Sequence, residues 1–223
     1  MPGRNIMPTD FHELRLYHVA VGRMNDMVAR VRGPLAPLFQ RHGIRPAGYW
    51  VTQSGPDFPL LVYLTPWPSL EARNQAWAGF YADPEWHRVR AETNAGSELV
   101  IRYELNFLRA VRPLELSRIT ATMALELYMP EIAIGASGGA HQLMRELAEA
   151  PPPSAPAVLG AFEFMTGDDL PRAALLLGWD RETCDARSTA ALEQAPLGRA
   201  RRYALRSITT DPDGRDRDTF LSD

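Results

Sequence analysis

The sequence predicts an α+β protein in which tandem ferredoxin-like βαββαβ repeats form an intrachain pseudo-dimeric α/β barrel. Three observations predict this fold. Short motifs recur between the two halves, strand-like segments alternate apolar and polar residues, and apolar residues between those segments recur at helical spacing. The chain has 223 residues, of which 45% are hydrophobic. That size and composition are enough for one large or two small domains with an apolar core.

The internal repeat consists of short matches that keep the same order. Residues 14–17 (LRLY) match 125–128 (LELY), 48–50 (GYW) match 160–162 (GAF), 64–67 (LTPW) match 176–179 (LLGW), 72–73 (AR) match 186–187, and 102–105 (RYEL) match 202–205 (RYAL). On this alignment Arg15 corresponds to Glu126 and Tyr17 to Tyr128. The repeat predicts one domain over residues 9–112, a second and divergent domain over 119–209, and a polar tail over 210–223.

The first copy reads as β, α, β, β, α, β. Alternation predicts strands over residues 11–19, 47–53, 60–65 and 99–108. The helix that follows the first strand contains Gly33-Pro34, which predicts a kink, and Gly43 predicts its end. Ser69 is expected to cap the next helix, and Asp83-Pro84 is typical of the start of another.

The second copy follows the same plan with a shorter helical part. We expect strands over residues 124–129, 157–165, 173–177 and 201–208, and helices over 141–150 and 182–194. This copy has no counterpart of the Asp83-Pro84-Glu85-Trp86 element.

Several motifs of the first copy together resemble the NIPSNAP family. They are residues 13–17 (ELRLY), 39–43 (FQRHG), 48–50 (GYW), 64–67 (LTPW), Ser69, Arg73, 83–86 (DPEW) and 106–108 (NFL), which span about residues 11–110. The resemblance implies the dimeric α/β-barrel superfamily, in which two ferredoxin-like sheets face each other around a cavity. Relatives in that superfamily include cyclases, cofactor-free oxygenases, isomerases, haem enzymes and stress proteins, so the resemblance implies a fold more than a reaction.

Composition excludes several classes of partner. Charged residues make up 23% of the chain and the formal net charge is −3, so no basic face for nucleic acid is expected. No apolar stretch approaches the roughly 18 residues of a membrane span, and residues 1–10 do not look like a secretory signal. Cys184 is the only cysteine, which fits a reducing compartment. These features predict a soluble cytoplasmic protein without nucleic-acid or membrane partners.

Candidate site residues follow from a prediction of which strand face points into the barrel. We expect Leu14 and Leu16 to face the helices, so the polar residues of the first strand would face the cavity. Glu126 and Tyr128 would do the same in the second copy. In the last strands the predicted inward sets are Arg102, Glu104 and Asn106, and Arg202, Ala204 and Arg206.

A cavity lined this way suits an oxygen-bearing, partly aromatic molecule. We expect a small-molecule enzyme of biosynthesis or catabolism that uses cofactor-independent acid–base chemistry: cyclisation, isomerisation, elimination or addition. Glu126 would be the base, Tyr17 the proton donor, and Arg15 or Arg102 the anion holder. The remaining candidates for substrate binding are Glu13, Tyr63, Trp50, Glu104, Asn106, Tyr128 and Glu163.

Three alternatives stay open. Inward charges such as Arg15 and Glu126 could pair and fill the barrel, giving a non-catalytic ligand-binding or stress-response protein with a narrow lumen. Haem or oxygen chemistry is a further possibility, and so is a homodimer of such chains. No metal site or cofactor is expected, because the histidines are scattered and no zinc or phosphate-loop motif is present. The size of the cavity discriminates between the enzyme and the filled barrel.

Overall fold

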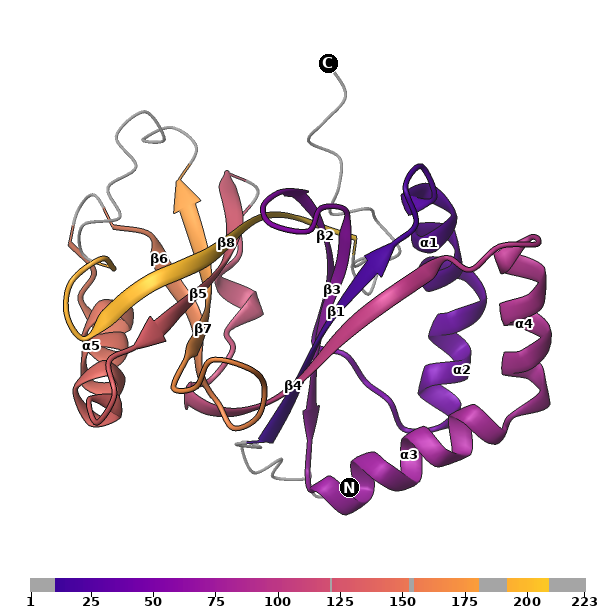
Figure 1. The fold of residues 1–223 in the computed structure, drawn as a ribbon, viewed down its shortest axis with the longest axis horizontal. Helices are drawn as coiled ribbons and strands as arrows, with labels where there is room; N and C mark the ends of the chain where they lie inside the picture. The colour runs from indigo at the N-terminus through magenta and orange to yellow at the C-terminus, as the bar shows by residue number, and fades with distance from the viewer. Residues whose placement is uncertain (1–10, 121, 153–154, 181–191, 209–223) are drawn as a thin grey trace.

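A closed, antiparallel, eight-stranded barrel is the centre of the computed structural model, which describes residues 11–120, 122–152, 155–180 and 192–208 (Figure 1). The strand order around the barrel is β1-β3-β2-β8-β5-β7-β6-β4. Each half therefore has an equivalent order, β4-β1-β3-β2 and β8-β5-β7-β6, and the halves join where β2 pairs with β8 and β4 with β6. This is the α+β barrel that the sequence predicts.

The first half contains four strands and most of the helical residues. In chain order it comprises β1 (Phe11–Val19), α1 (Met24–Arg30), the π-helical η1 (Val31–Leu35), α2 (Ala36–Arg41), β2 (Gly48–Ser54), β3 (Leu60–Trp67), α3 (Leu70–Ala82), α4 (Pro84–Asn94) and β4 (Val100–Arg112). All of these helices lie on the outer side of their sheet (Figure 1).

The predicted helix signals of the first half are confirmed. Gly33 leaves helical geometry at φ −95° and ψ −106°, next to Pro34. Gly43 ends α2 with a φ of +72°. The Ser69 hydroxyl accepts a hydrogen bond from the Ala72 backbone N–H at 3.1 Å, and Asp83 accepts one from the Glu85 N–H at 2.9 Å. Each cap satisfies an N–H group that the first turn of a helix leaves without a partner.

The second half has one described long helix. It comprises the short 3-10 turn η2 (Leu116–Arg118), β5 (Met123–Ile132), α5 (Ser137–Glu149), β6 (Ala157–Phe164), β7 (Ala173–Asp180) and β8 (Leu197–Ser207). Most of the helix expected over 182–194, with Cys184, and the tail over 210–223 lie outside the described residues. Residues 192–194 are in a turn rather than a helix.

The barrel lumen is largely filled by an apolar core drawn from both halves. Leu14 and Leu16 of β1 pack there with Leu127 of β5 and Leu176 of β7. Separate apolar clusters lie between the strands and the helices on each side. The prediction that the β1 leucines face the helices is therefore wrong. A closed barrel must fill its interior, and these leucines fill it.

The pairing register also corrects the alignment of the two halves. Leu14 pairs with Leu64, and Leu127 pairs with Leu176, so Leu14 corresponds to Leu127 rather than to Leu125. The same register makes Glu13 the counterpart of Glu126 and Arg15 the counterpart of Tyr128. The sequence alignment of β1 with β5 was therefore shifted by two residues. Only that shift placed Arg15 and Glu126, which carry opposite charges, at the same position.

The β2–β3 and β6–β7 connections share a local conformation. Gly55 and Gly167 have φ values of +131° and +120°, and Asp57 and Asp169 have values of +57° and +54°. Both aspartates lie at the entrance to the cavity described below. The two connections therefore place equivalent residues at the same opening.

Candidate functional site

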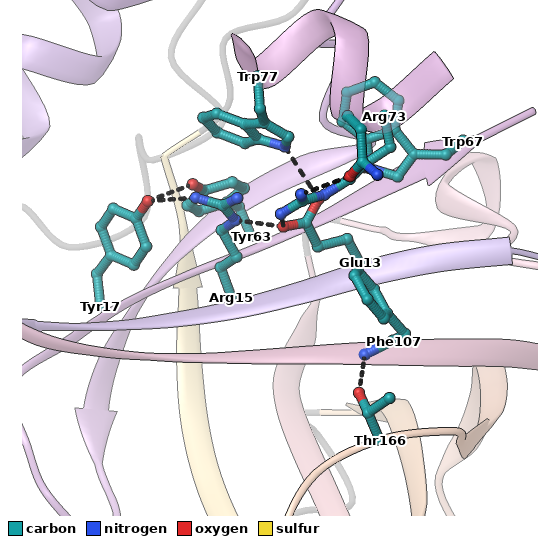
Figure 2. A network of polar contacts seen from close by, with 10 residues as sticks. Glu13, Arg15, Tyr17, Tyr63, Trp67, Arg73, Trp77, Phe107 and Thr166 are labelled. Atoms are coloured by element: carbon teal, nitrogen blue, oxygen red, sulfur yellow. Dashed lines mark hydrogen bonds and ion pairs between the residues drawn. The ribbon is translucent and has the colours of Figure 1, made fainter. Parts of the chain in front are cut away.

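The polar residues of β1 form a closed network outside the lumen, beneath α3 (Figure 2). Arg15 Nε donates a hydrogen bond to Glu13 at 2.6 Å, and Arg15 Nη1 donates one to the Tyr17 hydroxyl at 2.8 Å. The Tyr63 hydroxyl donates to Tyr17 at 2.9 Å. The Arg15 guanidinium also lies over the Trp77 ring, 3.6 Å from its centroid. These side chains contact one another, and none of them lines the cavity described below.

Glu13 is the centre of this network and is almost completely buried. Its carboxylate accepts hydrogen bonds from the indoles of Trp67 and Trp77 at 3.0 and 3.1 Å, and from Arg73 at 2.9 and 3.1 Å. Burial opposes ionisation, but the hydrogen bonds from Arg73 and the charge of Arg15 hold the pKa of Glu13 below its usual value. The prediction that these side chains line the cavity is wrong. Glu13, Arg15, Tyr17 and Tyr63 point to the helix-covered face of the sheet, where their hydrogen-bond partners lie.

Glu126 has an equivalent place in the second half. Its carboxylate accepts a hydrogen bond from the indole of Trp179 at 2.7 Å, as Glu13 does from Trp67. Arg202 completes the site as an ion-pair partner. Glu126 therefore pairs within its own half, so the alternative in which Glu126 and Arg15 pair with each other is wrong.

Three further candidates for substrate binding, Tyr128, Glu163 and Trp50, also do not line a large cavity. Tyr128 is buried on the outer side and donates a long hydrogen bond of 3.4 Å to the Leu192 carbonyl. Glu163 lies 3.2 Å from His141 of α5. Trp50 is in the lumen but belongs to its packed apolar core.

A cavity of about 720 Å³ opens between β4 and β8, the strands on opposite sides of the barrel. We call it the chamber. Its wall on β4 includes Arg102, Glu104 and Asn106, which the sequence placed on the inward face. The other lining residues are Asp57, Tyr103, Leu105, Met129, Glu131, Gly167, Asp168, Asp169, Arg172, Arg199, Ala200 and Arg201. Beyond it, the space among Leu14, Leu64 and Leu176 shrinks to about 20 Å³. The barrel thus has a packed apolar part and an open polar part.

An ion pair spans the chamber. Arg201 Nη2 of β8 lies 2.8 Å from Glu104 Oε2 of β4. Behind Glu104, His18 Nε2 lies 3.5 Å from its carboxylate and 3.0 Å from Arg102 Nη2. Burial raises the pKa of Glu104, but the hydrogen bond and the charge of Arg201, together with the smaller contributions of His18, lower the pKa overall. The chamber wall therefore carries an ionised carboxylate near neutral pH.

Several buried polar atoms beside the chamber have no hydrogen-bond partner within the described part of the chain. They are Asn106 Nδ2, Arg201 Nε and Tyr203 Oη. Buried polar groups are nearly always satisfied in native proteins. Burial raises the pKa of Tyr203, so its hydroxyl remains a donor. This part of the barrel therefore offers hydrogen-bonding groups to a polar ligand.

Comparison with known protein families identifies one part of the chain. The NIPSNAP family model matches residues 12–112. Residues 12–112 form a NIPSNAP domain. No curated protein matches the chain. An uncharacterised NIPSNAP domain protein from Burkholderia xenovorans is 18% identical and covers 44% of this chain and 91% of its own, with a TM-score of 0.38.

Two solved structures are similar over nearly the whole chain, beyond the NIPSNAP domain. A "putative monooxygenase" from Lactobacillus acidophilus NCFM covers 90% of this chain and 95% of its own, with 8% identity and a TM-score of 0.56. One from Fusobacterium nucleatum covers 92% and 94%, with 6% identity and a TM-score of 0.56. At such identity the similarity shows the fold alone, that of an α+β barrel.

Sequence reasoning missed the chamber residues outside the NIPSNAP domain. Arg201 and Tyr203 face the lumen, whereas Arg202, Ala204 and Arg206 were expected to. The recurrence of Gly55-x-Asp57-x-Pro59 as Gly167-x-Asp169-x-Pro171 marks equivalent turns, but it has the same offset as the other matches of the second and third strands and does not show which face of β8 points inward.

The described residues offer no metal site and no membrane-spanning helix. Among them, no group of three or more His, Cys, Asp and Glu side chains is placed to hold a metal ion. No helix in the described ranges is long and apolar enough to cross a bilayer.

Proposed function

We propose that this protein binds an organic small molecule in the chamber and catalyses cofactor-independent acid–base chemistry on it. The observation that carries the proposal is a cavity of about 720 Å³ whose wall presents an ionised Glu104 held by Arg201. Ligand pockets of a few hundred to about 1,000 Å³ are typical of proteins that enclose small molecules. Side chains fill the apolar part of the lumen, but a chamber of this size leaves room for a ligand in the polar part.

Glu104 is the group best placed to accept a proton. It lines the chamber, and Arg201 keeps it ionised. A carboxylate with a lowered pKa is a weak base, so it suits a carbon acid that neighbouring carbonyl groups make more acidic. Isomerisation, cyclisation and elimination at such a carbon all begin with this proton transfer.

This proposal moves the catalytic role away from Glu126, Tyr17 and Arg15. The hydrogen bonds and burial of those residues support structural roles on the helix-covered faces. Arg102, Glu104 and Asn106 keep the substrate-binding role proposed from the sequence.

A proton-exchange assay tests the proposal. The probe is 2-tetralone, a bicyclic ketone whose α-protons exchange with deuterium in D₂O when a base removes them, followed by proton NMR. We expect the wild-type protein to accelerate exchange and Glu104→Gln to lose about 10²-fold or more of that acceleration. Glu149→Gln, an exposed change at the end of α5, should behave as wild type. Equal rates for wild type, Glu104→Gln and buffer would overturn the catalytic role.

A binding protein without catalysis is the second candidate, since the chamber alone supports it. It predicts that 2-tetralone binds with no accelerated exchange. Ligand-observed NMR on the same samples separates the two.

We also propose that the chain arose by duplication, with domains over residues 9–112 and 119–209. The equivalent strand orders and the shared turn conformations at Gly55 and Gly167 support this. In relatives with one such unit per chain, a homodimer would complete the barrel. Here both halves of the barrel come from one chain.

A further inference from the structure

Arg172 is a buried cation that has no counter-ion among the residues that the structure describes. Its side chain is 8% exposed, yet no carboxylate oxygen of the described residues lies within 4.0 Å of its guanidinium. Its one hydrogen bond there is a long one of 3.5 Å, donated by Nη1 to the Asp168 carbonyl. Burying a charge is unfavourable unless it is paired and hydrogen-bonded. The position therefore needs an explanation beyond packing.

The location of Arg172 directs its guanidinium to the chamber. It precedes Ala174 and Leu176 on β7, which belong to the lumen core, and so shares their inward face. The aliphatic part of this face ends where Arg172 joins the chamber wall. Its guanidinium lies 5.0 Å from the centre of the Phe164 ring, which limits how far it can turn.

The neighbouring cation Arg201 makes the charged form of the Arg172 guanidinium less favourable, so an anion bound there would stabilise it. Burial and the positive charge of Arg201 lower the pKa of Arg172, while Asp169 and Glu104 act in the opposite direction. Glu104 is already paired with Arg201. Glu131 faces Arg172 across an isolated backbone bridge on β5, without a side-chain ion pair. Among the described residues, the local carboxylates therefore leave Arg172 unpaired.

The corresponding place in the first half has no charge. By the register of the two halves, Leu60 corresponds to Arg172, and Leu60 is fully buried in the lumen core. The barrel fold does not need an arginine at this place.

We propose that Arg172 binds an anionic oxygen group of the ligand, a carboxylate or the oxyanion of an enol or phenol, at the inner end of the chamber. This deepens the proposed function and rests on it, because the anion belongs to the molecule that the chamber encloses. A guanidinium offers parallel N–H donors that match such a group. Asn106 Nδ2 and the Tyr203 hydroxyl, which have no partner within the described ranges, are further donors for it.

Matched probes test the anion site. Benzoate and benzamide have the same shape and differ in charge, and their binding is measured by isothermal titration and ligand-observed NMR. We expect wild-type protein to bind benzoate at least about 10-fold more tightly than benzamide. Arg172→Gln should weaken benzoate binding about 10- to 100-fold and leave benzamide binding unchanged.

Two further variants control the comparison. Arg145→Gln removes the same charge from the exposed face of α5 and should retain benzoate binding. Arg172→Lys keeps the charge but loses the planar fork, so an intermediate affinity is expected if Arg172→Gln does not fold.

The outcomes separate this inference from the proposed function. Equal binding of the two probes, or benzoate binding that Arg172→Gln leaves intact, overturns the anion site. The chamber then remains a small-molecule site if 2-tetralone exchange persists. Failure of benzoate to bind the wild-type protein also overturns the anion site, whereas loss of 2-tetralone binding and exchange overturns the proposed function.

Discussion

Glu104 and Arg201 occupy equivalent positions in the two halves of the barrel and form an ion pair across its lumen. Glu104 pairs in register with Leu16 on β1, and Arg201 pairs with Met129 on β5. Leu16 and Met129 are themselves equivalent, each two residues after a leucine of the lumen core. A symmetric barrel would place two like charges here. Here the two positions carry opposite charges instead. They form an ion pair of 2.8 Å across the lumen, and the chamber is therefore asymmetric.

Removing one partner of this pair should destabilise the fold. Arg201→Met removes the closest cation from the partly buried Glu104 and leaves only the longer contacts with His18 and Arg102, and we expect a loss of about 1–3 kcal/mol in the free energy of unfolding. Urea denaturation followed by circular dichroism measures it. The double variant with Glu104→Gln should recover part of the loss, since no charge is then left unpaired. Strict additivity of the two changes would contradict the pairing.

The pH dependence of stability should reflect the same pair. The folded-state pKa of Glu104 is lowered relative to about 4.3 in the unfolded chain. Its contribution is therefore complete above the unfolded value and is lost as the pH falls through the folded value. Stability of the wild type should decline on acidification below about pH 5, and Glu104→Gln should show a shallower decline. Identical slopes would argue against an ionised Glu104.

The network beneath α3 should be structural. Glu13→Gln leaves Arg15, which is 2% exposed, without its carboxylate, so we expect a loss of about 3–5 kcal/mol in unfolding free energy. Where the variant stays folded at low temperature, its exchange of 2-tetralone should equal that of the wild type. A folded Glu13→Gln protein without exchange activity would restore Glu13 to the active site.

The leucines of the lumen core should behave as buried packing residues. Leu127→Ala removes apolar volume between the two halves, and a loss of about 2–5 kcal/mol is expected. Thermal and chemical unfolding measure it. A loss below about 1 kcal/mol would indicate that Leu127 is not enclosed by the barrel.

Gly167 should be required at the chamber entrance. Its φ of +120° is unfavourable for other residues, and a Cβ atom there would lie 2.5 Å from Asn106 Oδ1. Gly167→Ala should therefore destabilise the protein by roughly 1–3 kcal/mol and weaken benzoate binding. Gly138→Ala, in α5 where a Cβ atom meets nothing within 4 Å, is the matched control.

The sequence predicts the order of strands and the helix caps because those signals are local. Alternation marks β1, and Ser69 and Asp83 satisfy the first N–H groups of α3 and α4. It does not predict which face of β1 points inward. Both faces are buried, one by the lumen and one by the helices, so alternation fixes the period but not the side.

Register was the second limit. A strand pattern with a period of two resembles itself after a shift of two residues, so LRLY and LELY match in letters while their residues are not equivalent. The equivalence of Glu13 and Glu126 depends on hydrogen bonds from Trp67 and Trp179 on a neighbouring strand. Only the folded chain brings those partners together.

The central claim is that the chamber between β4 and β8 encloses the ligand. A crystal structure of the protein grown with 2-tetralone tests it most directly. We expect the ketone to lie in the chamber, with an α-carbon against the Glu104 carboxylate. A chamber that holds only water while the ketone binds elsewhere, or not at all, would contradict the account.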